Sequence, residues 1–412
     1  GYLTGRRHVR MRPLDRIGNR RHWGKSTATA DQAVPATVNS VSAPKPRNLY
    51  GEAAVDQMVT GLIAAVGDDS NDDMIRRLVT TALDMDAARL SRLELKIASQ
   101  ALAEMLNGSK VFSQDPDRAK CTVFGSARTS PDSPDYEITA EFCRQIAELD
   151  WMIISGAGPG VMTAAIEGAG IENSYGVNIV LPFEARAAEI IADDPKLATF
   201  KYFFTRKLYF MKESDAFVLM PGGFGTLDEA FELLTLVQTG KSYPAPIVLL
   251  DSEGSTYWDG WKRFVTDELL AGGNIGEADT ALYFHTHDPG EAARYVCHFY
   301  SAYHSIRYVG KRLIVRLNRS VSNETIATLN DEFGDIIVSG VLERAEPTEA
   351  EQRDDDHLNL DRLRMRFNNR SFARLHQLIC RMNDLAATDD QAPARRGLVH
   401  DVGPDPEDIQ DD

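Results

Sequence analysis

Short apolar runs that alternate with helical segments, from Ala119 to about Ser305, constrain the fold of this chain more than any other feature. The runs are CTVFG, WMIISG, YGVNIVLP, AFVLMPGG and PIVLLD. Apolar runs of about four to eight residues are typical of strands in a parallel sheet that is buried on both faces. The segments between them, among them YEITAEFCRQIAEL and TLDEAFELLTLVQTG, have the pattern of helices. We therefore predict a doubly wound, Rossmann-like α/β domain over residues 119–305, with ligands beyond the carboxyl ends of its strands.

Two smaller regions flank this domain. Residues 51–118 show helical periodicity without strand alternation, which predicts a small helical N-terminal region whose role is packing. Residues 308–385 have the pattern strand, helix, strand, strand, helix, which predicts a small C-terminal α+β domain of ferredoxin-like type. Within it, we interpret the acidic segment EPTEAEQRDDDH as a surface loop between strands.

Charge is spread unevenly along the chain. Residues 1–50 hold ten Lys or Arg and two acids, whereas the end, DVGPDPEDIQDD, is acidic. We interpret residues 1–50 as a disordered basic tail and residues 386–412 as an acidic tail. An RNA-binding arm and an organelle-targeting peptide are the alternatives for the basic tail. The formal net charge of -16 argues against non-specific nucleic-acid binding by the whole protein.

The cysteines and the hydropathy pattern predict a cytoplasmic protein. Four cysteines lie far apart, with no CxxC pair, which fits a reducing compartment. No apolar run approaches the roughly 20 residues that span a bilayer. No segment resembles the hydrophobic core of a secretory signal either. We therefore expect no membrane partner.

Glycines follow the first two predicted strands. The first strand ends in FGSART, where a turn at Ser126 lets the backbone approach a ligand, although an ordinary strand-to-helix turn explains it equally well. The second strand ends in SGAGPGVM, with Gly156, Gly158 and Gly160. Val161 occupies the position of the third glycine of a dinucleotide fingerprint, so standard NAD binding is disfavoured. The loop still presents backbone N–H groups at a helix start, which suits an anion.

The strand AFVLMPGG runs into the glycine-rich segment MPGGFGTLDEAFELL, residues 220–234. Gly222, Gly223 and Gly225 permit positive φ and close approach, and a helix predicted to begin near Thr226 aims free N–H groups at a ligand such as phosphate. A second interpretation is equally consistent with the spacing. Thr226 and Glu229 match a capping box, in which Glu229 only folds back onto the helix end. The spacing alone does not choose between a phosphate site and a capped helix.

The preceding segment FFTRKLYFMKESD favours the phosphate site. Arg206 and Lys207 begin a helical stretch whose apolar residues face the core, so two cations stand near the functional end of the sheet. A phosphate and a carboxylate at one helix terminus would repel each other without such a cation. Surface solvation is the alternative for Lys207.

These segments resemble a known family. TRK at 205–207 and PGGFGTLDE at 221–229 are similar to the Arg-Lys and PGGxGTxxE motifs of the Lonely Guy family of nucleoside 5'-monophosphate phosphoribohydrolases, long labelled lysine decarboxylase-like. VFGSA, SGAGPGVM and GVNIVLP match as well. Members cleave the N-glycosidic bond of nucleotides such as AMP to give free base and ribose 5-phosphate. The SGAGPG loop, in place of GGGxxG, and the long flanking regions look closer to bacterial purine/pyrimidine monophosphate nucleosidases than to dedicated cytokinin activators.

The resemblance implies roles for individual residues. Arg206 and Glu229 correspond to the catalytic pair. The substrate-binding residues that it implies are Ser126, Gly156, Gly158, Gly160, Lys207, Gly222, Gly223, Gly225 and Thr226. Because Glu229 lies in the predicted first helical turn, we expect the helix dipole to favour its ionised form, which would stabilise positive charge on the ribose. Arg206 cannot donate a proton, so we expect it to orient the phosphate or the base.

The resemblance also implies a homo-oligomer, dimer or higher, and it implies no cofactor. A rival hypothesis is a non-catalytic nucleotide sensor whose C-terminal domain transmits the signal. Arg206 together with Glu229 favours chemistry, since phosphate binding alone does not require the carboxylate. The old label implies a pyridoxal-phosphate decarboxylase, which needs a Schiff-base lysine. Neither Lys207 nor Lys212 nor Lys241 lies in a recognisable cofactor motif.

Two histidines in the segment FHTHD are possible metal ligands. No third ligand with suitable spacing accompanies His285 and His287, so we predict a structural loop at a strand end and no metal site.

Overall fold

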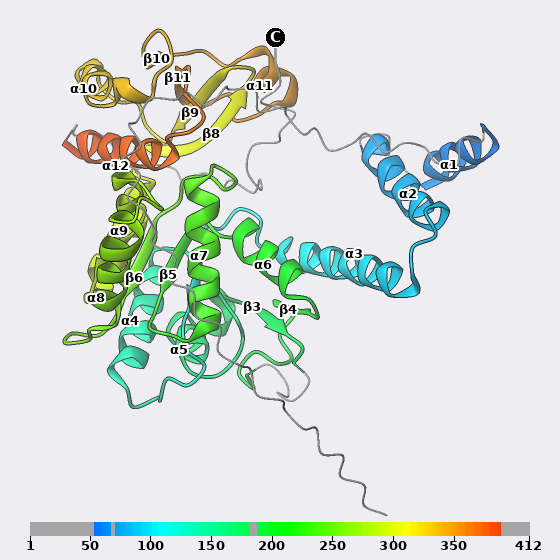
Figure 1. The fold of residues 1–412 in the computed structure, drawn as a ribbon, viewed down its shortest axis with the longest axis horizontal. Helices are drawn as coiled ribbons and strands as arrows, with labels where there is room; N and C mark the ends of the chain where they lie inside the picture. The colour runs from blue at the N-terminus through cyan, green and yellow to red at the C-terminus, as the bar shows by residue number, and fades with distance from the viewer. Residues whose placement is uncertain (1–52, 67–70, 182–187, 389–412) are drawn as a thin grey trace, which may run out of the picture. The chain divides into compact units, whose positions relative to one another are not determined.

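The structure, a computed structural model, describes residues 53–66, 71–181 and 188–388, which all belong to one compact unit and contain two sheets (Figure 1). The predicted basic tail at 1–50 and most of the predicted acidic tail at 386–412 lie outside these residues. Among the described residues, no helix combines the length and the apolar character that a bilayer crossing requires.

A seven-stranded parallel sheet forms the centre of the fold and confirms the predicted doubly wound α/β architecture. Its order is β4-β3-β2-β1-β5-β6-β7. The strands are β1 (Lys120–Phe124), β2 (Met152–Ser155), β3 (Ser174–Ile179), β4 (Leu197–Phe200), β5 (Ala216–Leu219), β6 (Ile247–Leu250) and β7 (Phe284–Thr286). The chain order reverses direction between the neighbours β1 and β5, which is where such sheets bind ligands.

Helices cover both faces of this sheet because strand residues point alternately to one face and the other. Val218 of β5 packs in the core with α4 (Pro134–Glu148), α5 (Val161–Ala169) and α9 (Pro289–Phe299). Its neighbours Phe217 and Leu219 pack in the opposite core with α6 (Phe203–Lys212), α7 (Phe224–Gln238) and α8 (Tyr257–Phe264). Shorter helical segments are η1 (Ile171–Asn173), η2 (Val265–Leu270) and η3 (Glu277–Ala281).

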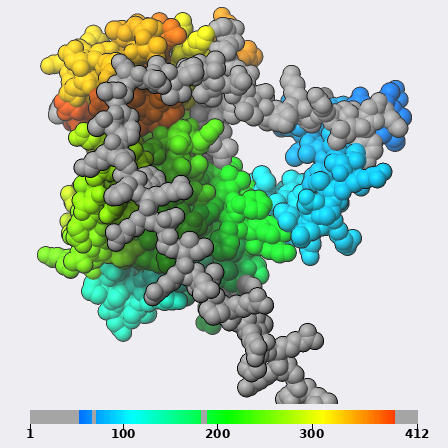
Figure 2. Space-filling model, in the orientation of Figure 1, coloured from blue at the N-terminus to red at the C-terminus, as the bar shows by residue number. Residues whose placement is uncertain are grey.

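The N-terminal region is helical, as predicted. It consists of α1 (Ala53–Val66), α2 (Asp72–Ala87) and α3 (Arg92–Phe112). A capping box starts α3, since Ser91 Oγ accepts a hydrogen bond from the Glu94 N–H at 3.3 Å and the Ser91 N–H donates to Glu94 Oε2 at 2.7 Å. The side of α3 that meets the α/β domain joins its core through Phe112. In Figure 2, the cyan surface of α3 adjoins the green surface of α6, and hydrogen bonds from the start of α6 to Glu104 hold the two helices together.

An antiparallel sheet and two long helices form the small C-terminal α+β part. The sheet order is β10-β11-β9-β8. The elements are β8 (Tyr303–Val309), β9 (Arg312–Leu317), α10 (Asn323–Phe333), η4 (Gly334–Ile336), β10 (Glu343–Arg344), α11 (Glu349–Asp354), β11 (Asp361–Met365) and α12 (Phe372–Thr388). The first hairpin, β8–β9, was not predicted, and it gives a strand order in sequence that differs from the ferredoxin-like pattern. The predicted strand DIIVSGVLER yields only β10 and an isolated bridge from Ile337 to Phe367.

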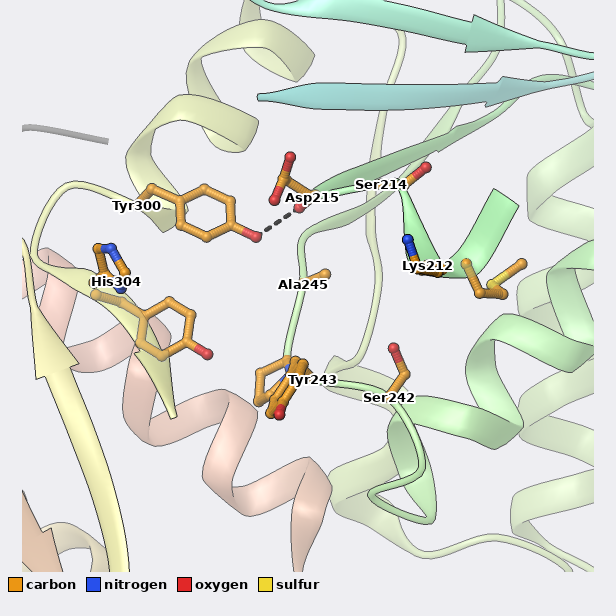
Figure 3. Close-up of a pocket in the computed structure, with 11 residues that line it drawn as sticks. Lys212, Ser214, Asp215, Ser242, Tyr243, Ala245, Tyr300 and His304 are labelled. Atoms are coloured by element: carbon orange, nitrogen blue, oxygen red, sulfur yellow. Dashed lines mark hydrogen bonds between the residues drawn. The ribbon is translucent and has the colours of Figure 1, made fainter. Parts of the chain in front are cut away.

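The two sheets meet at the amino ends of β5 and β6, where a pocket opens (Figure 3). Tyr300 donates a hydrogen bond to the backbone oxygen of Asp215 at 2.6 Å across this junction. His376 of α12 lies 3.3 Å from the backbone oxygen of Ala245. The pocket is lined by Met211, Lys212, Ser214, Asp215, Ser242, Tyr243, Pro244, Ala245, Tyr300, Tyr303 and His304. It lies at the end of the sheet opposite to the glycine-bearing loops, so we do not assign the nucleotide to it.

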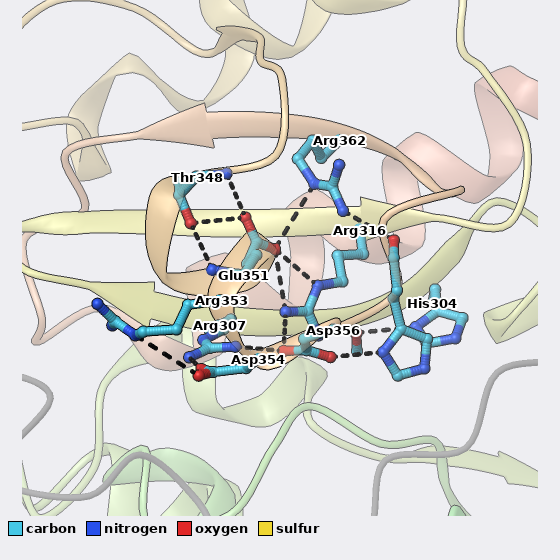
Figure 4. A network of polar contacts seen from close by, with 11 residues as sticks. His304, Arg307, Arg316, Thr348, Glu351, Arg353, Asp354, Asp356 and Arg362 are labelled. Carbon is cyan, nitrogen blue, oxygen red and sulfur yellow. Dashed lines mark hydrogen bonds and ion pairs between the residues drawn. The ribbon is translucent and has the colours of Figure 1, made fainter.

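The acidic segment 346–357 is not a surface loop, and that prediction was wrong. It contains α11, which Thr348 and Glu351 start with a capping box, and the Glu351 side chain is fully buried (Figure 4). Arg316 donates to Glu351 Oε1 at 3.0 Å, and Arg362 Nε lies 3.6 Å from the same oxygen. Burial would raise the pKa of Glu351, but hydrogen bonds from Thr348 and Arg316 outweigh burial and lower it. The acid is thus the centre of a buried ion network.

Candidate active site

The glycine-bearing loops lie together at the carboxyl ends of β1, β2 and β5. The Ser126 N–H, after β1, donates to the backbone oxygen of Pro221, after β5, at 3.2 Å. The Val161 N–H, at the start of α5, donates to the backbone oxygen of Ser126 at 3.1 Å. Three loops that are far apart in sequence are therefore tied into one edge, next to the point where the strand order reverses.

The glycine-rich segment after β5 runs directly into α7, which begins at Phe224 with Gly223 as its N-cap. The predicted start near Thr226 was too late. Thr226 is the third residue of the helix and Glu229 lies in its second turn, so no capping box forms between them and Gly223 contributes no side-chain cap. The structure removes the interpretation of Glu229 as a mere cap.

The glycines of this segment provide space and close packing, not an unusual backbone conformation. Gly222, Gly223 and Gly225 do not adopt the positive φ that glycine permits. A Cβ at Gly222 would lie 2.1 Å from Thr226 Oγ1, so packing against the helix requires this glycine. Added Cβ atoms at Gly223 and Gly225 would meet no atom within 4 Å, so both face open space at the start of α7.

Arg206 of α6 is fixed against the ends of β2 and β3. Its Nε donates to the backbone oxygen of Val177 at 2.9 Å, and one terminal nitrogen donates to the backbone oxygen of Gly156 at 3.3 Å. The guanidinium carbon lies 5.1 Å from the centre of the Phe210 ring. Burial lowers the pKa of Arg206 to about 10, against the opposing effect of Glu229, so the side chain stays cationic at neutral pH.

Glu229 is buried, with 6% of the residue exposed. Burial raises the pKa of its carboxyl group, and the charges of Arg206 and Lys207 oppose this without cancelling it. This corrects our expectation that the helix dipole favours the ionised form. The dipole acts mainly on the first turn, whereas Glu229 lies in the second and pays the cost of leaving water.

Lys207 is not a solvated surface lysine. Its Nζ lies 2.8 Å from Asp228 Oδ2 and 2.7 Å from Glu232 Oε2, which are one turn apart on α7. The side chain is 14% exposed. Lys207 therefore joins α6 to α7, next to Arg206 in sequence and across from Glu229.

The loop after β2 fits closely around its neighbours. Gly160 has φ +68°, and a Cβ there would lie 2.4 Å from the backbone oxygen of Ser126. A Cβ at Gly156 would lie 2.7 Å from the Arg206 guanidinium, and one at Gly158 would lie 2.7 Å from Met162. Gly156 and Gly160 thus allow the close approach of Arg206 and of the first loop, respectively.

Sequence reasoning missed one residue that positions the site. Glu104 of α3 is 3% exposed, and its carboxylate accepts from Thr205 Oγ1 at 2.6 Å and from the Lys201 and Tyr202 N–H groups at 3.1 and 3.4 Å. It satisfies backbone and hydroxyl donors at the start of α6, directly before Arg206. One signal was available, since a Glu on the apolar side of a helix is unusual. Its partner could not be named from the sequence.

A third potential metal ligand accompanies the two histidines of FHTHD, contrary to our expectation. Asp251, at the end of β6, contacts His285 and His287. No sequence spacing connects it to them, because it is 34 residues from His285.

Known proteins resemble this chain over the α/β domain. Residues 160–296, which include Arg206 and Glu229, match the family model described as possible lysine decarboxylase. The chain is 28% identical over 208 residues to a probable cytokinin riboside 5'-monophosphate phosphoribohydrolase of Oryza sativa subsp. japonica, covering 49% of this chain and 87% of that protein. It is 29% identical over 137 residues to the cytokinin riboside 5'-monophosphate phosphoribohydrolase of Mycobacterium tuberculosis, covering 33% of this chain and 72% of that protein.

Among solved structures, this chain is similar to that of the molybdenum cofactor carrier protein of Chlamydomonas reinhardtii. The two are 19% identical, the TM-score is 0.30, and the match covers 42% of this chain and 93% of that one. The family model and the curated relatives agree with the motifs TRK and PGGFGTLDE, which lie on α6 and at the start of α7. Residues 160–296 therefore match the lysine decarboxylase-like model, and the α/β domain of this chain is similar to the cytokinin riboside 5'-monophosphate phosphoribohydrolases of the Lonely Guy family.

Proposed function

We propose that this chain hydrolyses the N-glycosidic bond of nucleoside 5'-monophosphates, AMP-like nucleotides among them, to free base and ribose 5-phosphate. The observation that carries the proposal is a buried carboxyl group, Glu229, beside a partly buried cation, Arg206, at the ligand-binding end of a parallel sheet. The relatives named as phosphoribohydrolases support this class of reaction.

The start of α7 is the proposed place of the 5'-phosphate. The first intrahelical backbone bond runs from the Leu227 N–H to the Gly223 oxygen, so the N–H groups of residues 224–226 precede it and point out of the helix end. Gly223 and Gly225 leave open space there for an oxyanion. We propose that Ser126 and the loop of Gly156, Gly158 and Gly160 line the nucleoside part of the site.

Glu229 is the proposed catalytic carboxylate. Cleavage of the glycosidic bond develops positive charge on the ribose, which a carboxylate in a water-poor site stabilises strongly. A raised pKa also makes Glu229 a better base than an exposed glutamate, so it can accept a proton from the attacking water. Arg206 holds the substrate through the guanidinium donors that Val177 and Gly156 do not use.

We propose that Lys207 assists phosphate binding by neutralising the two acids that it contacts on α7. Asp228 and Glu232 would otherwise place two negative charges beside a bound phosphate on α7. The side chain of Asp228 is 60% exposed. Lys207 can therefore release Asp228 and pair with the phosphate of the nucleotide instead.

We also propose a cytoplasmic homo-oligomer, a dimer or higher. Phe224 at the start of α7 is 95% exposed, and Phe203 and Phe204 at the start of α6 are 52% and 56% exposed. Exposed apolar side chains at the starts of these two helices are what a second subunit or a bound base would cover.

The test is to incubate the full chain with AMP and with adenosine and to measure free adenine and ribose 5-phosphate. We expect release from AMP, and far slower release from adenosine, because the phosphate supplies binding energy that positions the ribose. Equal rates would contradict the phosphate site. Binding of AMP by calorimetry without release of base would favour the nucleotide sensor instead.

A further inference from the structure

Three potential metal ligands that are not among the proposed nucleotide-binding residues converge beside α8. Asp251 directly follows β6, and His285 and His287 lie within and just after β7. The two strands are parallel neighbours, with Leu250 opposite Thr286, so the residues at their carboxyl ends share one edge of the sheet. One ligand atom from each of the three side chains lies within 4.8 Å of the other two.

Both imidazoles meet the same carboxylate oxygen. His285 Nε2 lies 2.9 Å, and His287 Nδ1 lies 2.8 Å, from Asp251 Oδ1. His287 Nδ1 is also 3.1 Å from the backbone oxygen of Asp251. The side chain of Asp251 is fully buried, that of His285 is 10% exposed and that of His287 is 39% exposed. The cluster is therefore open to solvent on the His287 side, from which an ion could enter.

We propose that Asp251, His285 and His287 bind a divalent transition-metal ion of the zinc class. Two imidazole nitrogens and one carboxylate oxygen suit Zn²⁺ or Co²⁺, whereas Mg²⁺ and Ca²⁺ prefer oxygen ligands throughout. The ion would replace the protons that the two imidazoles now share with Asp251, and its charge would compensate the buried carboxylate. Three protein ligands leave the fourth position to water.

In the metal-free protein, Lys262 contacts His285 and so disfavours metal binding. It should therefore lower the affinity of the cluster for the ion. Its Nζ lies 2.8 Å from His285 Nδ1 and 2.9 Å from Asp259 Oδ1. A charged ammonium only donates, so His285 Nδ1 must accept and Nε2 must carry the proton. A metal on Nε2 reverses this, because the proton then sits on Nδ1 and faces the ammonium. Lys262, 40% exposed in its side chain, must then turn wholly to Asp259.

The site would act as a structural clamp at this end of the sheet. Asp251 Oδ2 accepts from the Trp258 N–H at 3.5 Å, and the preceding residue, Tyr257, donates to the backbone oxygen of Gly222 at 2.7 Å. An ion held by Asp251 would fix the start of α8 and, through Tyr257, the glycine-rich segment. The binding itself does not depend on the reaction proposed above.

The experiment is a Co²⁺ titration of the full chain after treatment with a chelator, followed by visible absorption. We expect one Co²⁺ per chain with the intense visible band of a four-coordinate ion, and displacement by Zn²⁺. The His285→Ala and His287→Ala variants should lose this binding. His298→Ala is the matched control, because His298 Nε2 lies 2.8 Å from Asp384 Oδ1 without a second imidazole, and it should titrate like the parent. Lys262→Met should bind roughly tenfold more tightly, as expected for an outer-shell change.

Three outcomes would overturn the proposal. The first is a parent protein without the visible band, and the second is a folded His287→Ala variant that keeps the band. His287 is partly exposed, so this variant should fold, which circular dichroism checks. The third is a near-ultraviolet charge-transfer band typical of thiolate ligands, which would assign the cobalt to cysteine.

Discussion

Gly225→Ala separates the two explanations of the glycine-rich segment. Gly225 is the second residue of α7, does not have a positive φ, and has open space where a Cβ would go. Alanine is about 1 kcal/mol better than glycine inside a helix, so the substitution should stabilise the fold by up to about 1 kcal/mol. If the segment only started a helix, the variant would be more stable and equally active.

A phosphate site predicts a different result. The methyl group would occupy the space in which an oxyanion approaches the N–H groups of residues 224–226, displacing it from at least two of them. Charge-assisted hydrogen bonds are worth about 1.5–3 kcal/mol each, so the loss of two should lower kcat/KM for AMP roughly a hundredfold or more. We therefore expect an enzyme that is more stable and nearly inactive.

The assay combines urea unfolding with the rate of adenine release from AMP. Gly61→Ala is the matched control, because Gly61 is also a helical glycine with nothing within 4 Å of an added Cβ, and it lies in α1. It should be stabilised by a similar amount and keep full activity. A Gly225→Ala variant with parental kcat/KM would refute the reasoning, and the start of α7 would then have no ligand.

Three further outcomes are expected. Glu229→Gln should lose base release but keep AMP binding by calorimetry, since the charge matters most in the transition state. Because burial raises the pKa of Glu229 above its ordinary 4.5, the carboxylate form, and with it kcat/KM, should be lost as pH falls through that raised pKa; a pH–rate profile without such an acid limb would contradict this. Glu351→Ala should lower the unfolding free energy by about 3–5 kcal/mol, because it leaves Arg362 buried without its acid and Arg316 with Asp356 alone, whereas exposed Glu349→Ala should change it little in urea unfolding.

The sheet was largely predictable because five of its strands lie in continuous apolar runs. The sequences of the other two, LATF in β4 and FHT in β7, are interrupted by Thr or His, so β4 was missed and β7 was predicted only as a loop at a strand end. The prediction of a surface loop at residues 346–357 failed for another reason. Composition indicated solvent, but Glu351 is buried by arginines from β9 and β11, and such a long-range pairing leaves no local signal.

Of the proposed site, the sequence indicates the residues that lie in motifs. The motifs point to Arg206 and to the glycine-rich segment before α7, although the predicted start of α7 was too late. The raised pKa of Glu229 was not predictable, because it depends on burial by distant elements and on where α7 starts. The pairs Asp251–His285 and Lys207–Glu232 likewise join separate elements, and single-sequence spacing is silent on such contacts.

Glu104 has a consequence for how this domain could be moved between proteins. The family match spans residues 160–296, yet the start of the helix that carries Arg206 depends on a carboxylate from α3, outside that span. A fragment or chimera cut at the edges of the match would leave the donors of residues 201, 202 and 205 without this acceptor and let α6 fray just before its arginine. The smallest transplantable module therefore begins no later than α3. A graft of the motifs alone would carry the residues of the proposed site without the carboxylate that holds the start of α6.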